Sequence, residues 1–177
     1  MPHFSTLELS VIFLVLLAAA TDLASRKIPN LLVVAGLMLA LVLRLQTGDF
    51  FSLATWLTGM LTGFVVLFPL YLMRGMAAGD VKLMAMVGSF VGPLMALQIC
   101  FATFLIGGLM GLAIVVYRRR FRDAMTNMQS MLSPLLLRAI GVPVSPLTLP
   151  PGLSVGGMPY GLAIAIGTLA LLYWHQN

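Results

Sequence analysis

Long apolar runs separated by short polar breaks make up most of the chain. A helix needs about 20 mostly apolar residues to cross a hydrocarbon core of roughly 30 Å. Four runs qualify, and a fifth, from Leu83 to Tyr117, is too long for one helix and is interrupted by Gly92-Pro93, a dipeptide typical of turns. The pattern therefore predicts an all-α, polytopic membrane protein with six transmembrane helices. We expect them at about residues 7–24, 28–46, 52–73, 79–91, 94–117 and 157–174.

Two of these predictions leave alternatives open. The run after Leu83 could instead form one kinked span, which would move the basic cluster Arg118 to Arg122 to the other side of the membrane. The fourth helix, 79–91, spans only about 20 Å at 1.5 Å per residue. Either it begins earlier, near Gly75, or the bilayer is thinner there.

Positive charge favours six helices and sets their orientation. With six spans, nine of the ten Lys and Arg residues lie on one side and only Arg44 lies opposite. The positive-inside rule makes the basic side cytoplasmic, so we expect both termini on the non-cytoplasmic face. The segment Met1 to Glu8 has no Lys or Arg, and the charges follow the first apolar run. Because this order is the reverse of a secretory signal, we expect the first helix to stay in the mature protein.

Composition agrees with a membrane protein. The 177 residues are 60% apolar and 8% charged, with a mean hydropathy of +1.06, whereas a soluble domain carries about 25% charged residues. Soluble enzymes, secreted mini-proteins and disordered tails are excluded. The single cysteine, Cys100, excludes a disulfide framework and a cysteine-built zinc site. The net charge of +5 is explained by topology, and no nucleic-acid partner is expected.

The segment 118–155 differs from the spans. It opens with the basic run Arg118 to Arg122, after which apolar residues recur at helical spacing. This pattern predicts a basic amphipathic helix on the cytoplasmic leaflet, acting as a connector or as a substrate-docking element. Prolines from Pro143 to Pro151 then indicate a stiff linker. The chain has no internal repeat, the usual signature of an inverted-repeat transporter.

Only two of the five acidic residues fall at membrane depth. Glu8 and Asp49 lie at the outer face, and Asp123 lies in a polar segment. Asp22 ends the first predicted helix and Asp80 begins the fourth, both at the cytoplasmic end. Singly, Asp80 could cap its helix and Asp22 could pair with a neighbouring arginine. As a pair, they point to function, because ionisable groups in membranes are costly.

Two adjacent carboxyl groups support one type of chemistry. They cannot both ionise readily, so the pair shares a proton. The ionised partner can deprotonate a water molecule while the protonated partner polarises a peptide carbonyl, with no metal and no nucleophilic side chain. Neither residue is assigned individually as acid or base. His3 and His175 lie near the outer face, so a Ser-His dyad or a HExxH-type zinc site is not expected at these acids.

Three segments carry a resemblance to a known family: DLASRKIPN at 22–30, GMAAGDVKL at 75–83 and PYG at 159–161. They resemble the two aspartate segments and the C-terminal motif of the prepilin peptidases, also called type IV leader peptidases. The resemblance covers about residues 10–170. It implies a membrane aspartyl protease of the GxGD type with Asp22 and Asp80 as the catalytic pair, forming a single membrane-embedded peptidase domain over 1–177.

The resemblance also implies a substrate and a location. The enzyme would remove the short basic leader of type IV pilin-like precursors at the cytoplasmic face of the bacterial inner membrane. Its partners would be these precursors and the lipid bilayer, with no cofactor, no metal and no nucleic acid. Larger family members carry an amino-terminal domain with cysteine pairs and also methylate the new terminus. This chain resembles the short, peptidase-only form that serves Flp (tight-adherence) pili, so no methyltransferase activity is expected; the sequence assigns no oligomeric state.

Five neighbouring residues are expected to support the aspartates. Gly79 would allow close backbone approach, and Pro29 would end the first helix while Asn30 caps the second. Lys82 would act on a carboxylate from a distance or meet a phospholipid. Ala77 replaces the first glycine of GxGD, which adds a Cβ where a helix or substrate approaches.

Two rival functions are considered. One is a non-catalytic membrane subunit of a pilus or secretion machine, an inactive relative in which the Ala77 change matters. The other is a proton-coupled carrier that uses the acids as a relay. A carrier needs further polar groups deep in its helices, and this chain offers only isolated ones such as Gln98 and Thr103.

Overall fold

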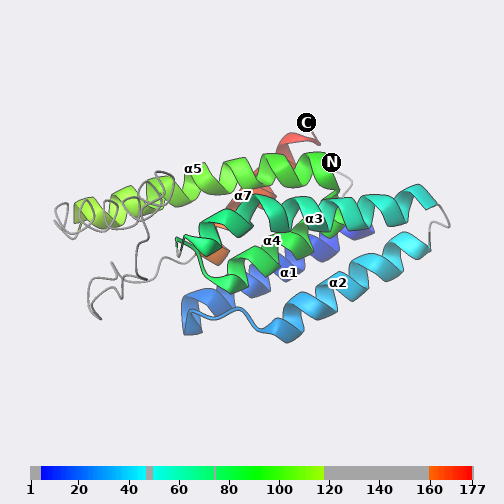
Figure 1. Cartoon of the computed structure of the whole chain (residues 1–177), viewed down its shortest axis with the longest axis horizontal. Coiled ribbons are helices and arrows are strands. Elements are labelled where there is room, and N and C mark those ends of the chain that lie inside the picture. Colours follow the sequence, from blue (N-terminus) through cyan, green and yellow to red (C-terminus); the bar gives the residue numbers. More distant parts are fainter. Residues whose placement is uncertain (1–4, 47–49, 74, 118–159, 177) are drawn as a thin grey trace, which may run out of the picture. The chain divides into compact units, whose positions relative to one another are not determined.

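The computed structural model describes residues 5–46, 50–73, 75–117 and 160–176, shown in colour in Figure 1. The expected amphipathic helix and linker at 118–155 lie outside the described residues. The chain forms two compact units, and residues 1–107 with 159–177 make up the first. Of the second unit, 108–158, only the end of one helix is described. The described helices are α1 (Thr6–Ser25), α2 (Asn30–Leu45), α3 (Phe50–Leu72), α4 (Ala78–Val91), α5 (Pro93–Tyr117) and α7 (Tyr160–Trp174).

The described part of the chain is all-α, with six helices in the predicted order. The predicted break at Gly92-Pro93 is confirmed, because α4 ends at Val91 and α5 begins at Pro93. Gly92 has φ +88°, a conformation that favours glycine. Pro93 has no N–H, and the first residue of a helix needs none. The fourth helix begins at Ala78, not near Gly75.

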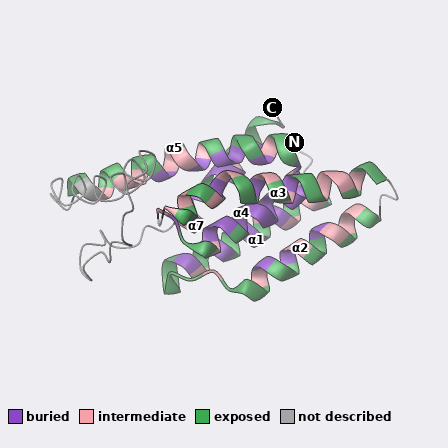
Figure 2. Cartoon of the chain, in the orientation of Figure 1, coloured by how far each residue is buried: buried purple, intermediate pink, exposed green. Residues whose placement is uncertain are grey.

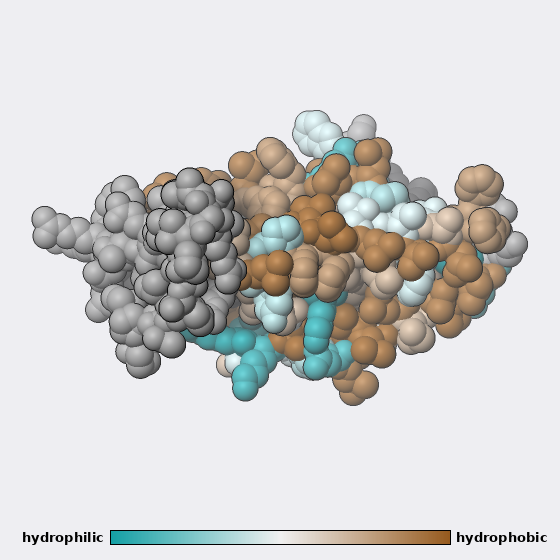
Figure 3. Space-filling view, in the orientation of Figure 1, coloured by the Kyte–Doolittle hydropathy of each residue, from teal (hydrophilic) through white to brown (hydrophobic). Residues whose placement is uncertain are grey.

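Several helices are suited to a lipid environment. By length and composition, three can cross a membrane: α1, α3 and the Pro93–Ile114 part of α5; α2 and α7 are shorter and also apolar. Many of their exposed large side chains are apolar, as in Leu31, which is 80% exposed. Figure 3 shows apolar surface over much of α2 and α3, with hydrophilic residues gathered where α1 ends and α2 begins. Multiple apolar helices indicate an integral membrane protein.

Helix α4 lies among the other helices of the first unit and contacts α1, α2, α3 and α7 (Figures 1 and 2). Ten of its 14 residues are buried, which makes it the most enclosed described helix. Large side chains such as Leu83, Met84 and Met86 are fully buried in it. The other helices therefore cover most of α4, and α4 carries one of the two candidate acids.

Glycines allow α3 to approach α4 closely. A Cβ built on Gly59 would overlap the carbonyl oxygen of Gly88, and a Cβ on Gly88 would overlap that of Gly59. One turn along α3, a Cβ on Gly63 would overlap the Met84 carbonyl oxygen. Small residues four apart let two membrane helices pack backbone against backbone, where van der Waals contact supplies the attraction.

Arg44, in the last turn of α2, binds the carboxyl end of α4. Its Nε donates to the Ser89 carbonyl at 3.1 Å, and its Nη2 donates to the Phe90 carbonyl at 2.7 Å. The last carbonyls of a helix have no partner within the helix, so an outside donor satisfies them. Arg44 therefore has a structural role on the outer side, where the charge pattern places it as the one basic residue.

Candidate active site

Asp22 lies in the last turn of α1 and is 7% exposed. Its Oδ2 accepts a hydrogen bond from the backbone N–H of Gly161 at 2.9 Å. The following turn is fixed as well, because Arg26 adopts φ +52° and donates its N–H to the Asp22 carbonyl at 2.8 Å. This left-handed residue ends α1 and leaves the Asp22 carboxyl group facing α7.

Gly161 is the second residue of α7, where backbone N–H groups have no partner within the helix. The positive end of the helix dipole also favours a carboxylate at this position. A Cβ on Gly161 would lie 2.8 Å from Oδ2 and 3.0 Å from Cβ of Asp22, so a larger residue would push the carboxyl group away. From the sequence, this glycine is part of the PYG motif and no separate role was expected for it. Its position at the start of a helix was the available signal.

Asp80 lies in the first turn of α4 and is 4% exposed. Its Oδ2 accepts from the backbone N–H of Ala77 at 3.2 Å, so the capping role considered from the sequence is present. Ala77 has φ −80° and ψ 152°, an extended conformation that alanine adopts readily, and its side chain is exposed. In the described chain, the added Cβ therefore obstructs no helix.

The two carboxyl groups lie near enough for the charge of one to act on the other. The charge of Asp80 also reaches Tyr160, the first residue of α7. Arg26 acts on Asp22 electrostatically, but the two form no ion pair in the described chain. Two buried carboxyl groups that interact in this way can share a proton, and acid and base catalysis by one pair of carboxyl groups requires this.

Comparison with known proteins gives the family. The type IV leader peptidase family matches residues 9–112, more than half of the chain, and this range includes both Asp22 and Asp80. The chain belongs to the type IV leader peptidase family. This is an aspartic-type prepilin peptidase family, and membership implies prepilins as substrates. No curated protein and no solved structure matches the chain.

Tyr160 and Gly161 lie outside the residues that match the family. The structure nonetheless brings α7 to both aspartates of this type IV leader peptidase family member, through the Gly161 hydrogen bond and the proximity of Tyr160 to Asp80. The candidate site is therefore built from three helices, α1, α4 and α7.

The turn between α1 and α2 supports the start of α4. The expectation that Asn30 caps α2 is wrong: Pro29 occupies the cap position, and Asn30 is the first helical residue. The Asn30 side chain is engaged elsewhere, since its Oδ1 accepts from Lys82 Nζ at 3.1 Å. Lys82, expected to act on a carboxylate or to meet lipid, thus ties α4 to α2.

Gly79 faces the same turn. A Cβ on Gly79 would lie 3.4 Å from the Cβ of Ile28, which is ordinary van der Waals contact. The neighbour beside Gly79 is therefore the side chain of Ile28, at a distance that a Cβ would tolerate. Gly79 has no positive φ, so its backbone conformation does not require glycine.

Other chemically active side chains lie away from the aspartates. Cys100 is fully buried in α5. The His175 ring lies 3.1 Å from Oε1 of Gln98, a residue near the start of α5, and His3 lies outside the described residues. Among the described residues, no group of three or more His, Cys, Asp or Glu side chains is placed to hold a metal ion.

Proposed function

We propose that the chain is a membrane aspartyl endopeptidase that removes the short leader of type IV pilin-like precursors. Membership of the type IV leader peptidase family supports this proposal. The observation that carries it is the pair of buried carboxyl groups, Asp22 from α1 and Asp80 from α4, which interact electrostatically.

In the proposed reaction, the ionised aspartate takes a proton from water as the water oxygen attacks the carbonyl carbon of the scissile peptide bond. The protonated aspartate donates a hydrogen bond to the carbonyl oxygen, which gains negative charge. The tetrahedral intermediate then collapses, and a proton passes to the leaving amide nitrogen. The Gly161 N–H acts as a positioning group, because it holds one oxygen of Asp22 in place.

We propose that cleavage occurs at the cytoplasmic face of the bacterial inner membrane, in a single peptidase domain with six transmembrane helices. Arg26, Lys27 and Lys82 lie at the ends of α1 and α4 that carry the aspartates. The positive-inside rule supports a cytoplasmic position for this end. The peptidase-only form that the sequence resembles supports leader removal without methylation.

The rival functions find less support. Ala77, the reason to consider an inactive relative, is exposed and adopts an ordinary extended conformation. A proton-coupled carrier needs a polar relay through the membrane. The buried hydroxyl groups of Ser89, Thr103 and Thr168 each donate to a carbonyl of their own helix, at 2.6 to 2.7 Å. Each of these hydrogen bonds is therefore made within one helix.

A gel-shift assay of leader removal tests the proposal. The chain is co-expressed with a small pilin that has a basic leader, a glycine at the junction and an apolar helix. We expect wild type to cleave it, and Asp22→Asn and Asp80→Asn each to lose at least about 100-fold in rate, the lower range for a lost general acid or base. Asp49→Asn, a carboxylate expected at the outer face, is the matched control.

Protein level and thermal unfolding of each variant distinguish lost chemistry from lost folding. Cleavage by either folded aspartate variant at the wild-type rate would contradict the dyad. A folded wild type that cleaves no pilin-like precursor would favour the non-catalytic subunit.

A further inference from the structure

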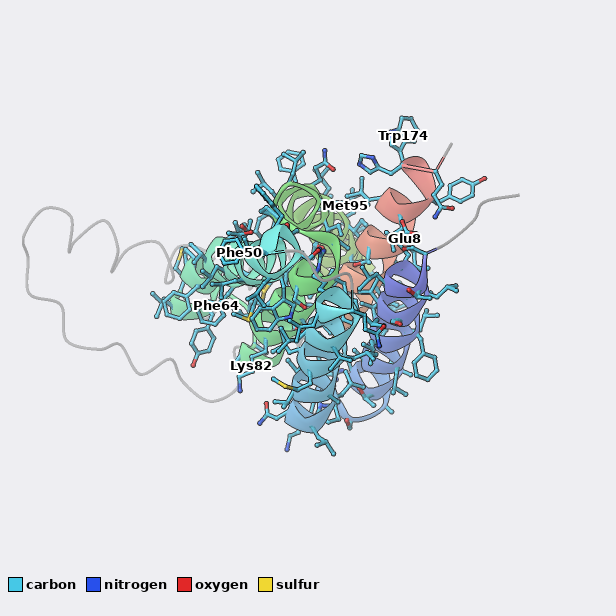
Figure 4. All side chains as sticks on the ribbon, turned by 90° about the vertical axis from the view of Figure 1, so that its right-hand side faces the viewer. Glu8, Phe50, Phe64, Lys82, Met95 and Trp174 are labelled. Atoms are coloured by element: carbon cyan, nitrogen blue, oxygen red, sulfur yellow. The ribbon has the colours of Figure 1, made fainter. Side chains whose placement is uncertain are left out.

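A groove of about 290 Å³ lies between α2 and α3, with α4 as its floor. Two polar residues, Asn30 and Lys82, lie at one end, and the rest of the lining is apolar. Figure 4 labels Phe64 and Lys82, two of the lining residues. The complete lining is Asn30, Val33, Val34, Leu37, Met60, Leu61, Phe64, Lys82 and Ala85.

The groove is separate from the aspartates. Residues of an α-helix are about 100° apart around the axis, so Ala85 lies about 140° around α4 from Asp80. Asp80 faces the side of α1 and α7, whereas Lys82 and Ala85 face α2 and α3. A molecule in the groove would therefore not touch the catalytic pair.

The surroundings of the groove are apolar. Val34 is 52% exposed and Leu61 is 47% exposed, and both belong to helices that are apolar along their length. In a membrane, such a surface faces hydrocarbon chains. The body of an occupant is accordingly apolar.

The polar end of the groove favours an anion. Lys82 is exposed, and in the described chain its Nζ donates a hydrogen bond to the neutral amide oxygen of Asn30 at 3.1 Å. Because that oxygen accepts from Lys82, the amide N–H groups of Asn30 remain available as donors. The amino end of α2 begins at the same residue, and its dipole also favours negative charge.

We infer that this groove binds one anionic phospholipid, with its phosphate at Lys82 and Asn30 and one acyl chain between α2 and α3. The groove extends for about 10 Å along α2, from Asn30 to Leu37, at 1.5 Å per residue. The positively charged end and the apolar body of the groove match an anionic head group that is joined to an acyl chain.

A lipid-binding measurement on the purified full chain tests the inference without using peptidase activity. Phosphatidylglycerol and phosphatidylcholine with identical acyl chains are added to the detergent-solubilised protein. Native mass spectrometry counts bound lipids, and thermal unfolding measures stabilisation. We expect one phosphatidylglycerol to remain bound and to raise the unfolding temperature by about 5 °C at saturating lipid. Phosphatidylcholine should bind more weakly.

Matched variants locate the site. Lys82→Gln should lower phosphatidylglycerol affinity about tenfold, the loss expected for one charged hydrogen bond, and Lys82→Arg should retain it. Lys27→Gln removes an exposed charge that does not line the groove and should change nothing. Val34→Trp should block the groove for either lipid, whereas Met38→Trp, at a residue 51% exposed outside the lining, should not.

Two results would overturn the inference. Equal binding of both lipids, unchanged in Lys82→Gln, would mean that no anionic head group is recognised. Blocked cleavage of a pilin-like precursor in Val34→Trp, with lipid binding unchanged, would make the groove a substrate site. Because the lipid measurement does not depend on cleavage, its failure would leave the proposed peptidase function intact.

Discussion

At the scale of single residues, the position of Asp22 depends on a glycine 139 residues away in the chain. Gly161 supplies a backbone N–H at 2.9 Å and, having no Cβ, leaves the space that the carboxyl group occupies. Both contributions concern the same oxygen atom, Oδ2. In the proposed reaction, a small displacement of this atom would change its alignment with the scissile bond, and a shift of about 1 Å in a catalytic group can cost about 100-fold in rate.

Gly161→Ala is therefore expected to lower kcat for leader removal by about 100-fold. The new Cβ would lie 2.8 Å from Asp22 Oδ2, so the carboxyl group must move. The N–H is retained and alanine favours helix, so the unfolding temperature should stay close to wild type. Single-turnover cleavage and thermal unfolding of the same preparation measure both quantities.

The control for this substitution is Gly108→Ala, because a Cβ there would meet nothing within 4 Å. It should cleave at the wild-type rate. If Gly161→Ala also cleaves at that rate, the position of Asp22 does not depend on Gly161.

At the scale of elements, α4 is a short helix that depends on its neighbours at both ends. Its 14 residues extend for about 20 Å, less than a hydrocarbon core of roughly 30 Å. Unsatisfied backbone groups cost several kcal/mol each in lipid. Asp80 binds the Ala77 N–H at one end, and Arg44 binds the Ser89 and Phe90 carbonyls at the other. The close glycine contacts with α3 enclose the middle.

Arg44→Met is expected to lower the free energy of unfolding by about 2 kcal/mol or more, because it leaves carbonyls of α4 without their donor. For a chain of this size the unfolding temperature should fall by about 4–8 °C. The cleavage rate of the folded protein should change little, since Phe90 lies about 15 Å along α4 from Asp80. Denaturation in detergent and an initial-rate assay measure the two effects.

Lys27→Met removes an equal charge from an exposed residue and serves as the control. Arg44→Lys should lie between the two, since lysine offers one donor group where arginine reaches two carbonyls. An unfolding temperature for Arg44→Met equal to that of Lys27→Met would mean that Arg44 does not stabilise α4.

At the scale of the whole molecule, the sequence predicts helix number and order because a bilayer requires long apolar runs. The motif around each aspartate likewise predicts that Asp22 and Asp80 belong to the candidate active site. Hydropathy does not distinguish a helix enclosed by helices from one that faces lipid, since both are apolar, so the enclosure of α4 was not predicted. Charge counting treated Arg44 as a topology signal, and local capping rules misassigned Asn30. The hydrogen bonds of Arg44 to α4 and of Lys82 to Asn30 join distant segments of the chain, so no local sequence pattern predicts them.

The last prediction concerns orientation, on which a cytoplasmic active site depends. In a Cys100→Ala background, Gln46→Cys and Ser25→Cys each place one thiol at an exposed residue, at the end of α2 and at the end of α1. A membrane-impermeant maleimide added to intact spheroplasts should label the first, because nine of ten basic residues are expected on the opposite side. It should label the second only after the membrane is permeabilised. The reverse result would place Asp22 and Asp80 at the outer face, where a leader still in the cytoplasm is out of reach.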